Sequence, residues 1–157
     1  MPLLITSHKT PVGTLNLLAD DQILIGANLS TVSAFKAGGD VKVVKSIPVI
    51  SDLIKDYFDG DLTALNGIQV RQPGAAFSQA AWKAMRKIAP GKTWSYSDLA
   101  QKAGSPAAVR AAGSACANNA IMLVVPCHRV VKTGGALGNY AYGVEKKQWL
   151  LSHEGFL

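Results

Sequence analysis

The chain is organised around residues 121–131, IMLVVPCHRVV, in which two apolar runs flank a Pro-Cys-His-Arg tetrapeptide. A continuous apolar run such as Ile121–Val125 predicts a strand that is buried on both faces. Pro126 has no N–H to donate to a ladder, so we expect strand pairing to stop there and the backbone to turn. The thiol of Cys127 is therefore predicted to lie at the end of a rigid element, beside the core.

Cys127 and His128 carry the first candidate chemistry. A neighbouring base or cation raises the thiolate fraction of a cysteine, so a thiol beside an imidazole is typical of a cysteine nucleophile. The alternative is a buried structural cysteine next to an unrelated histidine. For a Cys-His pair taken alone, the structural cysteine is the commoner case. The residues around Cys127 and His128 favour a nucleophile instead.

Length and composition predict a globular protein with one domain or two small ones. The 157 residues are 48% hydrophobic and 17% charged, which is enough for a buried core. No apolar run approaches the ~20 residues that span a bilayer, and the N-terminus lacks a signal-peptide pattern, so we expect a soluble cytoplasmic protein. Cys116 and Cys127 lack Cys-x-x-Cys spacing, which favours free thiols. Three scattered histidines predict no metal site, and we expect no cofactor.

The charge is unevenly distributed along the chain. Residues 1–73 carry six Lys or Arg against seven Asp, a net charge of −1, whereas residues 74–157 carry ten against three acidic residues, a net charge of +7. A basic half is typical of proteins that bind a polyanion. A solubilising surface is an equally compatible alternative on charge alone. We place the boundary near Pro73, which predicts an N-terminal scaffold domain over 1–73 and a C-terminal domain over 74–157.

The first domain is predicted to begin with β-structure. We expect strands over residues 3–6, 15–19 and 22–27, with a turn at Thr10–Gly13 and a hairpin turn at Asp20-Asp21. A helix should follow, with Ser51 as its N-cap and Gly60 after its end. Its apolar residues at helical spacing are Ile50, Leu53, Ile54, Tyr57 and Phe58.

The second domain is predicted to be mainly helical. Its first helix ends at Pro90-Gly91 and has one apolar face, formed by Phe77, Ala81, Trp82, Met85 and Ile88. Ser95 and Asp98 predict a capping box at the start of the next helix, which Gly104 closes. Ser105-Pro106 is expected to open another helix, giving a helix-turn-helix layout. The last helix is expected over Glu145–His153, with Trp149 and Leu150 directed inward.

The helix after Pro106 consists almost entirely of small residues, and Arg110 is its only charge. A smooth helix can approach a nucleic-acid groove closely and insert one long cation. Tight packing in the core explains the same composition equally well. The Gly-rich loop over residues 133–143 carries two aromatic residues and lacks the Gly-Lys-Ser/Thr order of a phosphate-binding loop.

The motif Pro126–Val131 resembles the active-site motif of the O6-alkylguanine-DNA alkyltransferases. The resemblance spans nearly the whole chain, because further similar segments follow the family's order: residues 10–13, 57–60, 94–96, the Arg110 helix, 138–140 and 149–155. It implies an α+β fold with an N-terminal ribonuclease H-like antiparallel sheet with helices. It also implies a C-terminal winged-helix-like (helix-turn-helix) domain.

The resemblance implies direct-reversal DNA repair in a single turnover. The Cys127 thiolate would take the alkyl group from O6 of guanine, or from O4 of thymine, while His128, a water and Glu154 relay the thiol proton. Tyr96 would donate to N3 of the leaving guanine, and Asn119 would brace the active-site turn. The implied partner of this monomer is double-stranded DNA containing O6-alkylguanine, bound through its minor groove with the damaged base flipped out.

The resemblance also implies residues that contact DNA and the base. Arg110 would fill the gap left by the flipped nucleotide, and the remaining DNA contacts would come from Tyr96, Ala107, Ala108 and Ser114. The guanine pocket would be lined by Val130, Tyr140, Ala141 and Tyr142. Tyr142 stands where several members have Gly, so we expect a narrow pocket that accepts methyl adducts better than benzyl adducts. The zinc-binding residues of some members have no counterparts here.

Three alternatives compete with repair. A non-catalytic alkyltransferase-like protein would bind alkylated DNA, but such proteins replace the reactive cysteine that is present here as Cys127. A helix-turn-helix regulator would bind specific DNA sequences even after Cys127→Ser. A Cys-His hydrolase would turn over repeatedly and would need an oxyanion hole, for which the sequence offers no candidate. Cys116 is expected to pack rather than to act as a second reactive thiol.

Overall fold

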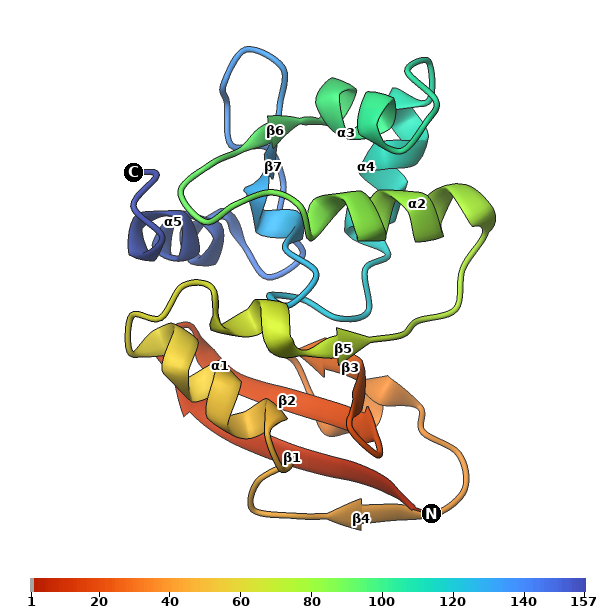
Figure 1. Ribbon diagram of the computed structural model, residues 1–157, viewed down its shortest axis with the longest axis vertical. Helices are drawn as coiled ribbons and strands as arrows, with labels where there is room; N and C mark the ends of the chain where they lie inside the picture. The colour runs from red at the N-terminus through yellow and green to blue at the C-terminus, as the bar shows by residue number, and fades with distance from the viewer. Residues whose placement is uncertain (1) are drawn as a thin grey trace. The chain divides into compact units, whose positions relative to one another are not determined.

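Figure 1 shows the fold as a computed structural model, which describes residues 2–157. The chain forms two compact units. The first extends to Gln72 and takes in Ala120–Val124, and the second comprises Pro73–Asn119 and Val125–Leu157. Over the described residues the chain has five α-helices and two sheets, which confirms the α+β class. None of the helices in this range is long and apolar enough to cross a membrane.

The first unit is built on a mixed five-stranded sheet with the order β4-β1-β2-β3-β5. An antiparallel meander forms its centre, from β1 (Leu3–Thr10), β2 (Gly13–Asp20) and β3 (Ile23–Asn28). The edges are β4 (Val41–Val43) and β5 (Gln69–Val70), which pair in parallel with β1 and β3. The predicted strands and both turns are confirmed. The first strand is longer than expected because it pairs with its neighbour as far as the turn.

The helix α1 (Ile50–Phe58) packs Ile50, Ile54 and Tyr57 into the core of this unit. The prediction that Ser51 is the N-cap is wrong, because that position belongs to Val49. The Ser51 hydroxyl instead accepts from the Ile47 N–H at 2.8 Å and lies 2.8 Å from Nε2 of His8. It therefore ties the start of α1 to the preceding loop and to β1. Short 3-10 turns lie at Val32–Phe35 and Ala64–Gly67.

The run Ile121–Val125 is buried as predicted, but it is not a regular strand. It pairs with β3 at one point only, where Ala27 lies opposite Ile121 in parallel. The Val124 N–H then bonds back to the Met122 carbonyl at 2.9 Å, and Leu123 has a φ of 74°. These local turns coil the chain before a ladder can form, because an apolar run becomes a strand only where a partner edge continues beside it.

The second unit packs four helices around a two-stranded parallel sheet. The helices are α2 (Ala76–Met85), α3 (Tyr96–Lys102), α4 (Val109–Ala117) and α5 (Val144–His153), and the strands are β6 (Trp94–Ser95) and β7 (Val130–Val131). The indole N–H of Trp82 donates to the Ala115 carbonyl at 2.9 Å and links α2 to α4. In α5, Leu150 is buried as expected, whereas Trp149 is half-buried and stacks on His153 with ring centroids 4.8 Å apart.

The predicted capping box at the start of α3 is confirmed. The Ser95 hydroxyl accepts from the Asp98 N–H at 3.0 Å, and the Asp98 carboxylate accepts from the Ser95 N–H at 2.9 Å. The predicted start of the next helix at Pro106 is wrong. The Ala108 N–H bonds to the Ser105 carbonyl at 2.9 Å, so this stretch forms a separate turn and α4 begins at Val109.

The small-residue helix α4 has one buried side and one exposed side. Ala112 and Ala115 are buried in the core of the unit, whereas Arg110 and Ser114 are exposed. Close packing therefore explains half of its composition. The exposed half remains available for a partner.

Candidate active site

Cys127 begins a 3-10 turn, Cys127–Arg129, which leads into β7. The carbonyl of Val125 accepts twice, from the Cys127 N–H at 2.8 Å and from Nδ2 of Asn119 at 2.8 Å. Asn119 follows the end of α4, so its amide fixes the backbone just before the thiol. Cys127 is 8% exposed, and the structure holds it as a free thiol.

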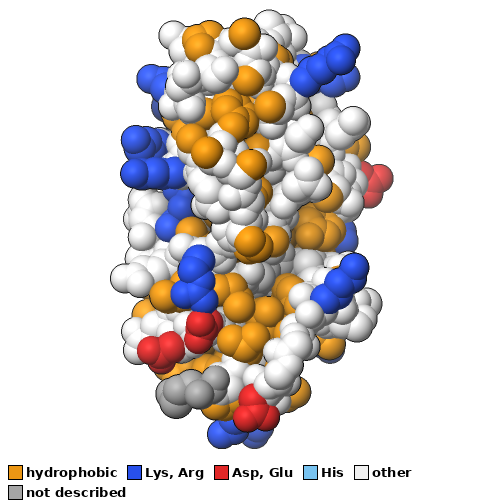
Figure 2. Space-filling model, turned by 90° about the vertical axis from the view of Figure 1, so that its right-hand side faces the viewer, with side chains coloured by type: hydrophobic (Ala, Val, Ile, Leu, Met, Phe, Trp, Pro, Cys, Tyr) orange, Lys and Arg blue, Asp and Glu red, His pale blue; other side chains and the backbone are white. Residues whose placement is uncertain are grey.

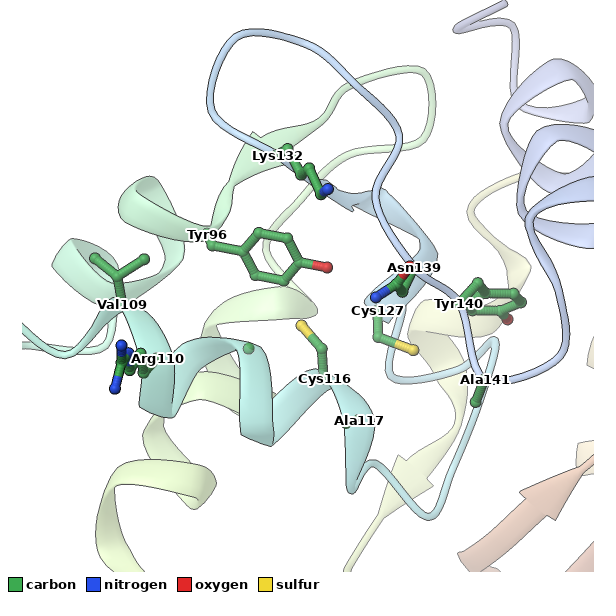
Figure 3. A pocket seen from close by; sticks show the side chains of 11 residues that line it. Tyr96, Val109, Arg110, Cys116, Ala117, Cys127, Lys132, Asn139, Tyr140 and Ala141 are labelled. Atoms are coloured by element: carbon green, nitrogen blue, oxygen red, sulfur yellow. The ribbon is translucent and has the colours of Figure 1, made fainter.

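The Cys127 side chain lines a cavity of about 500 Å³. Tyr96 and Cys116 enter it from α3 and α4, and residues 139–141 approach from the Gly-rich loop (Figure 3). Gly138 allows this approach, because it has a φ of 77° and a Cβ there would lie 3.4 Å from the Tyr96 hydroxyl. The full lining is Tyr96, Val109, Arg110, Gly113, Cys116, Ala117, Cys127, Lys132, Asn139, Tyr140 and Ala141.

Glu154 lies at the C-terminal end of α5 and is held by two neighbours of Cys127. Its Oε2 lies 2.8 Å from Nε2 of His128, and Arg129 donates to both carboxylate oxygens, at 2.8 Å and 3.0 Å. Arg129 also donates to the Ile88 carbonyl at 2.7 Å. All three side chains are buried. Gly91 gives room for this cluster, since a Cβ there would lie 3.0 Å from the Glu154 carbonyl oxygen.

The cluster fixes the charge state of its members. Burial raises the pKa of Glu154, but hydrogen bonds from His128 and Arg129 outweigh this and hold the carboxyl far below its usual pKa. Burial lowers the pKa of His128 below 6.5, against the opposing effect of Glu154. An ionised carboxylate only accepts, so the neutral imidazole donates from Nε2 and presents Nδ1 as an acceptor. Nδ1 is buried and has no hydrogen-bond partner among the described residues.

The two thiols of the cavity are both harder to ionise than a free cysteine. Burial raises the pKa of Cys127, while a hydrogen bond from Asn119 and the charge of Lys147 lower it. Burial, together with the charge of Cys127, raises the pKa of Cys116 to about 12. Because the thiolate is the reactive form, either thiol needs a base in order to react.

The structure brings some of the predicted residues to the cavity and leaves others away from it. Tyr96, Arg110, Cys127, Tyr140 and Ala141 line it. His128, Glu154 and Asn119 lie outside the lining: His128 bonds to Glu154, and Asn119 bonds to the Val125 carbonyl just before Cys127. Ala107, Ala108 and Ser114 lie outside the cavity, on or beside α4.

Tyr142 and Val130 differ from their expected positions as pocket walls. Tyr142 is absent from the lining and packs edge-on against Tyr140, with ring centroids 5.7 Å apart. Val130 is fully buried, and its carbonyl accepts from Nζ of Lys147 at 2.7 Å. Tyr142 therefore lies next to a residue of the cavity wall, Tyr140.

Sequence reasoning missed two cations of this site, Arg129 and Lys147. Arg129 was visible inside the Pro-Cys-His-Arg tetrapeptide, but nothing in the sequence assigned it a partner. Lys147 lies three, four and seven residues before Leu150, Leu151 and Glu154, so it shares their buried face of α5. That spacing was the available signal. Among the described residues, no group of three or more His, Cys, Asp or Glu could hold a metal ion.

Comparisons with known proteins agree on one family. The model of the 6-O-methylguanine DNA methyltransferase, DNA binding domain, matches residues 76–156. A methylated-DNA–protein-cysteine methyltransferase of Shigella flexneri is 35% identical over 159 residues, covering 94% of this chain and 93% of that protein. The crystal structure of Mycobacterium tuberculosis O6-methylguanine methyltransferase matches with a TM-score of 0.85 at 30% identity, covering 97% of this chain and 92% of that one.

A second crystal structure, that of Mycobacterium tuberculosis OGT in complex with DNA, matches with a TM-score of 0.86 at 30% identity. It covers 96% of this chain and 92% of that one. The likeness therefore holds in sequence and in fold over nearly the whole chain. The chain belongs to the family of methylated-DNA–protein-cysteine methyltransferases.

Proposed function

We propose that this protein repairs O6-alkylguanine in double-stranded DNA by direct reversal, accepting the alkyl group on Sγ of Cys127. One observation carries the proposal: the Cys127 thiol opens into a cavity and is followed by His128, which Glu154 and Arg129 hold in place. Methyl is the main group transferred, and O4-alkylthymine is a second substrate.

The transfer begins with removal of the thiol proton. Burial keeps Cys127 protonated at rest, and the neutral His128 offers Nδ1 to take its proton through an intervening water. The imidazolium that results is stabilised by the ionised Glu154 carboxylate, 2.8 Å from Nε2. The relay thus supplies a base for the nucleophile, and in the resting site the charge of Glu154 is already balanced by Arg129.

The thiolate then displaces guanine from the alkyl carbon. A sulfur–carbon bond forms as the carbon–O6 bond breaks, and the electron pair remains on the guanine. Tyr96 donates to guanine N3 as this charge develops, and burial raises the pKa of Tyr96, which keeps it a donor. The net reaction moves the alkyl group to sulfur and the thiol proton to guanine. A thioether is a poor leaving group, so each molecule reacts once.

The damaged base reaches Cys127 by flipping out of the helix into the cavity. Arg110 lies on the exposed side of α4 at the rim of the cavity, where it can fill the gap in the duplex. We place the minor-groove contacts on Tyr96 and on the neighbouring small residues Ala107, Ala108 and Ser114, of which Ala107 and Ser114 are exposed. Their small side chains allow close approach without reading the sequence.

Charge supports DNA as the partner of the second unit. This unit carries the net charge of +7, whereas the first unit carries −1. On the face drawn in Figure 2, Lys and Arg side chains are spread over the surface, whereas Asp and Glu appear in few places. Such a surface attracts phosphates independently of sequence.

The finer points of architecture are also proposals. We propose that α3 and α4 form the helix-turn-helix of a winged-helix-like domain over residues 74–157. The antiparallel meander with parallel edge strands supports a ribonuclease H-like scaffold over residues 1–73. We further propose a monomer that works in the cytoplasm, because all of the site residues come from one chain and reducing conditions keep Cys127 free.

The proposal is tested by following the DNA. A duplex with one O6-methylguanine is mixed with increasing amounts of protein, digested, and analysed for O6-methyldeoxyguanosine by chromatography. We expect one lesion to be restored to guanine per protein molecule. Repeated turnover would point to a hydrolase, and DNA binding with no loss of the lesion would point to a regulator.

A further inference from the structure

Lys147 is a buried cation that the transfer mechanism above does not use. Its side chain is fully buried (0% exposed) in α5. Among the described residues, the ion pairs are Arg71 with Asp20 and Glu154 with His128 and Arg129, so Lys147 has no carboxylate partner. A buried ammonium without a counter-charge destabilises a fold, and its retention calls for a function.

The contacts of Lys147 join the two sides of the active site. Its Nζ donates to the Val130 carbonyl at 2.7 Å and to the Asn139 carbonyl at 3.3 Å. Val130 closes the turn that begins with Cys127, because the Val130 N–H bonds to the Cys127 carbonyl. Asn139 lines the cavity next to Tyr140. Lys147 therefore connects the turn of the nucleophile to the loop that receives the base.

The charge of Lys147 also affects the ionisation of the Cys127 thiol. The charge of Lys147 lowers the pKa of Cys127, and a Cys127 thiolate raises the pKa of Lys147, against burial, which lowers it. A hydrogen bond from Asn119 also lowers the pKa of Cys127, and the charge of Cys127 in turn raises the pKa values of Cys116 in α4 and Tyr96 in α3. His128 and Glu154 lie beside it as the relay.

Other cations of the cavity are less suited to this role. Arg110 and Lys132 also line the cavity, but both are exposed, so water screens their charges.

We propose that Lys147 is the positioning residue of the transfer, holding the Cys127 turn against the base-binding loop and serving as the buried counter-charge of the thiolate. The inference rests on the proposed function, because it assumes that the Cys127 thiolate is the reacting species. In this proposal the His128 relay removes the proton from Cys127, and Lys147 stabilises the thiolate that remains.

The test uses Lys147→Gln, which keeps an N–H donor for the two carbonyls and removes the charge. The rate of iodoacetamide labelling of Cys127 is followed from pH 6 to pH 10 by peptide mass spectrometry, alongside methyl transfer from DNA. We expect the midpoint of the labelling profile to move to higher pH, with the rate at neutral pH falling about tenfold per pKa unit. Lys147→Arg should restore the midpoint, and Lys146→Gln, the same change one residue earlier in α5, should leave it unchanged.

The outcomes separate the two proposals. A Lys147→Gln profile with an unchanged midpoint overturns the role of Lys147, even if labelling is slower at every pH, because a structural role lowers the rate without moving the midpoint. Failure of the unmodified protein to take methyl from DNA overturns the proposed function instead, and the labelling profile still reports on Lys147.

If Lys147→Gln does not fold, a second measurement tests the proposal in the unmodified protein. In the unmodified protein, the ¹³Cε resonance of Lys147 is followed by NMR as a function of pH. We expect it to shift at the pH where Cys127 loses its proton, and we expect this step to vanish in Cys127→Ser. A resonance that is insensitive to Cys127 overturns the proposal.

Discussion

Arg129 grips Glu154 through two parallel hydrogen bonds, from Nε to Oε1 at 2.8 Å and from Nη2 to Oε2 at 3.0 Å. This fork fixes the plane of the carboxylate and leaves Oε2 directed at His128 as well. Arg129 and His128 are adjacent in the chain, so the turn Cys127–Arg129 supplies both the cation that binds Glu154 and the proposed base, His128. The position of His128, the proposed base, thus depends on a cation that lies outside the lining of the cavity.

Removing the charge of Glu154 should destabilise the protein strongly. In Glu154→Gln, the Arg129 guanidinium remains buried without its carboxylate, so we expect the free energy of unfolding to fall by about 3–5 kcal/mol. Urea denaturation measures this. The only other glutamate, Glu145, is exposed on the same helix, and Glu145→Gln should change stability by less than about 0.5 kcal/mol. Equal stability of the two variants would contradict a stabilising ion pair between Arg129 and Glu154.

Acid should destabilise the fold through His128 first and Glu154 second. Folding lowers the pKa of His128 below 6.5. Below pH 6.5 the unfolded chain therefore binds more protons at this residue than the folded protein does, and the free energy of unfolding falls as the pH falls. The Glu154 pKa is also lowered on folding, which extends the loss below about pH 4.5. His8 adds a loss of the same sign.

The contribution of His128 to this pH dependence is measured by comparing the unmodified protein with a variant that lacks the imidazole. Denaturation of the unmodified protein and of His128→Gln is compared at a series of pH values. The stability gap between them should narrow as the pH is lowered through 6.5 and below. Parallel curves would show that His128 does not titrate differently on folding.

Local signals in the sequence predicted local structure well. The Ser95–Asp98 capping box and the Asp20-Asp21 hairpin turn formed as expected, because each depends on residues within a few positions of one another. The apolar run Ile121–Val125 predicts a strand but forms turns instead, because strand formation depends on a partner edge elsewhere in the chain. The family motif predicts roles for Cys127, His128 and Glu154, and the structure bonds His128 to Glu154. It could not show which cations, Arg129 and Lys147, would be buried with them.

Tyr142 should restrict the pocket indirectly. Its ring packs against Tyr140, which lines the cavity, so we expect benzyl adducts to react at least about tenfold more slowly than methyl adducts. Tyr142→Gly should free Tyr140 and raise the rate with O6-benzylguanine, leaving the rate with a methyl adduct unchanged. Single-turnover rates with both adducts measure this. Equal rates in the unmodified protein would contradict it.

Val49 should be a site where glycine stabilises the first unit. This exposed β-branched residue has a φ of 69°, which L side chains adopt only with strain. We expect Val49→Gly to raise the free energy of unfolding by about 1 kcal/mol, since relief of strain exceeds the added entropy of the unfolded chain. Val43 is exposed in the regular strand β4, so Val43→Gly should lower stability. Equal losses in both variants would refute the strain at Val49.

Transfer of the alkyl group to Cys127 is tested most directly by intact mass. The protein is mixed with excess duplex containing one O6-methylguanine, and Cys127→Ser is treated in parallel. We predict a gain of one methyl group per molecule, mapped to the peptide that contains Cys127 and absent from the variant. An unchanged mass with DNA still bound, or a methyl group on Cys116, would contradict the assignment of Cys127 as the acceptor.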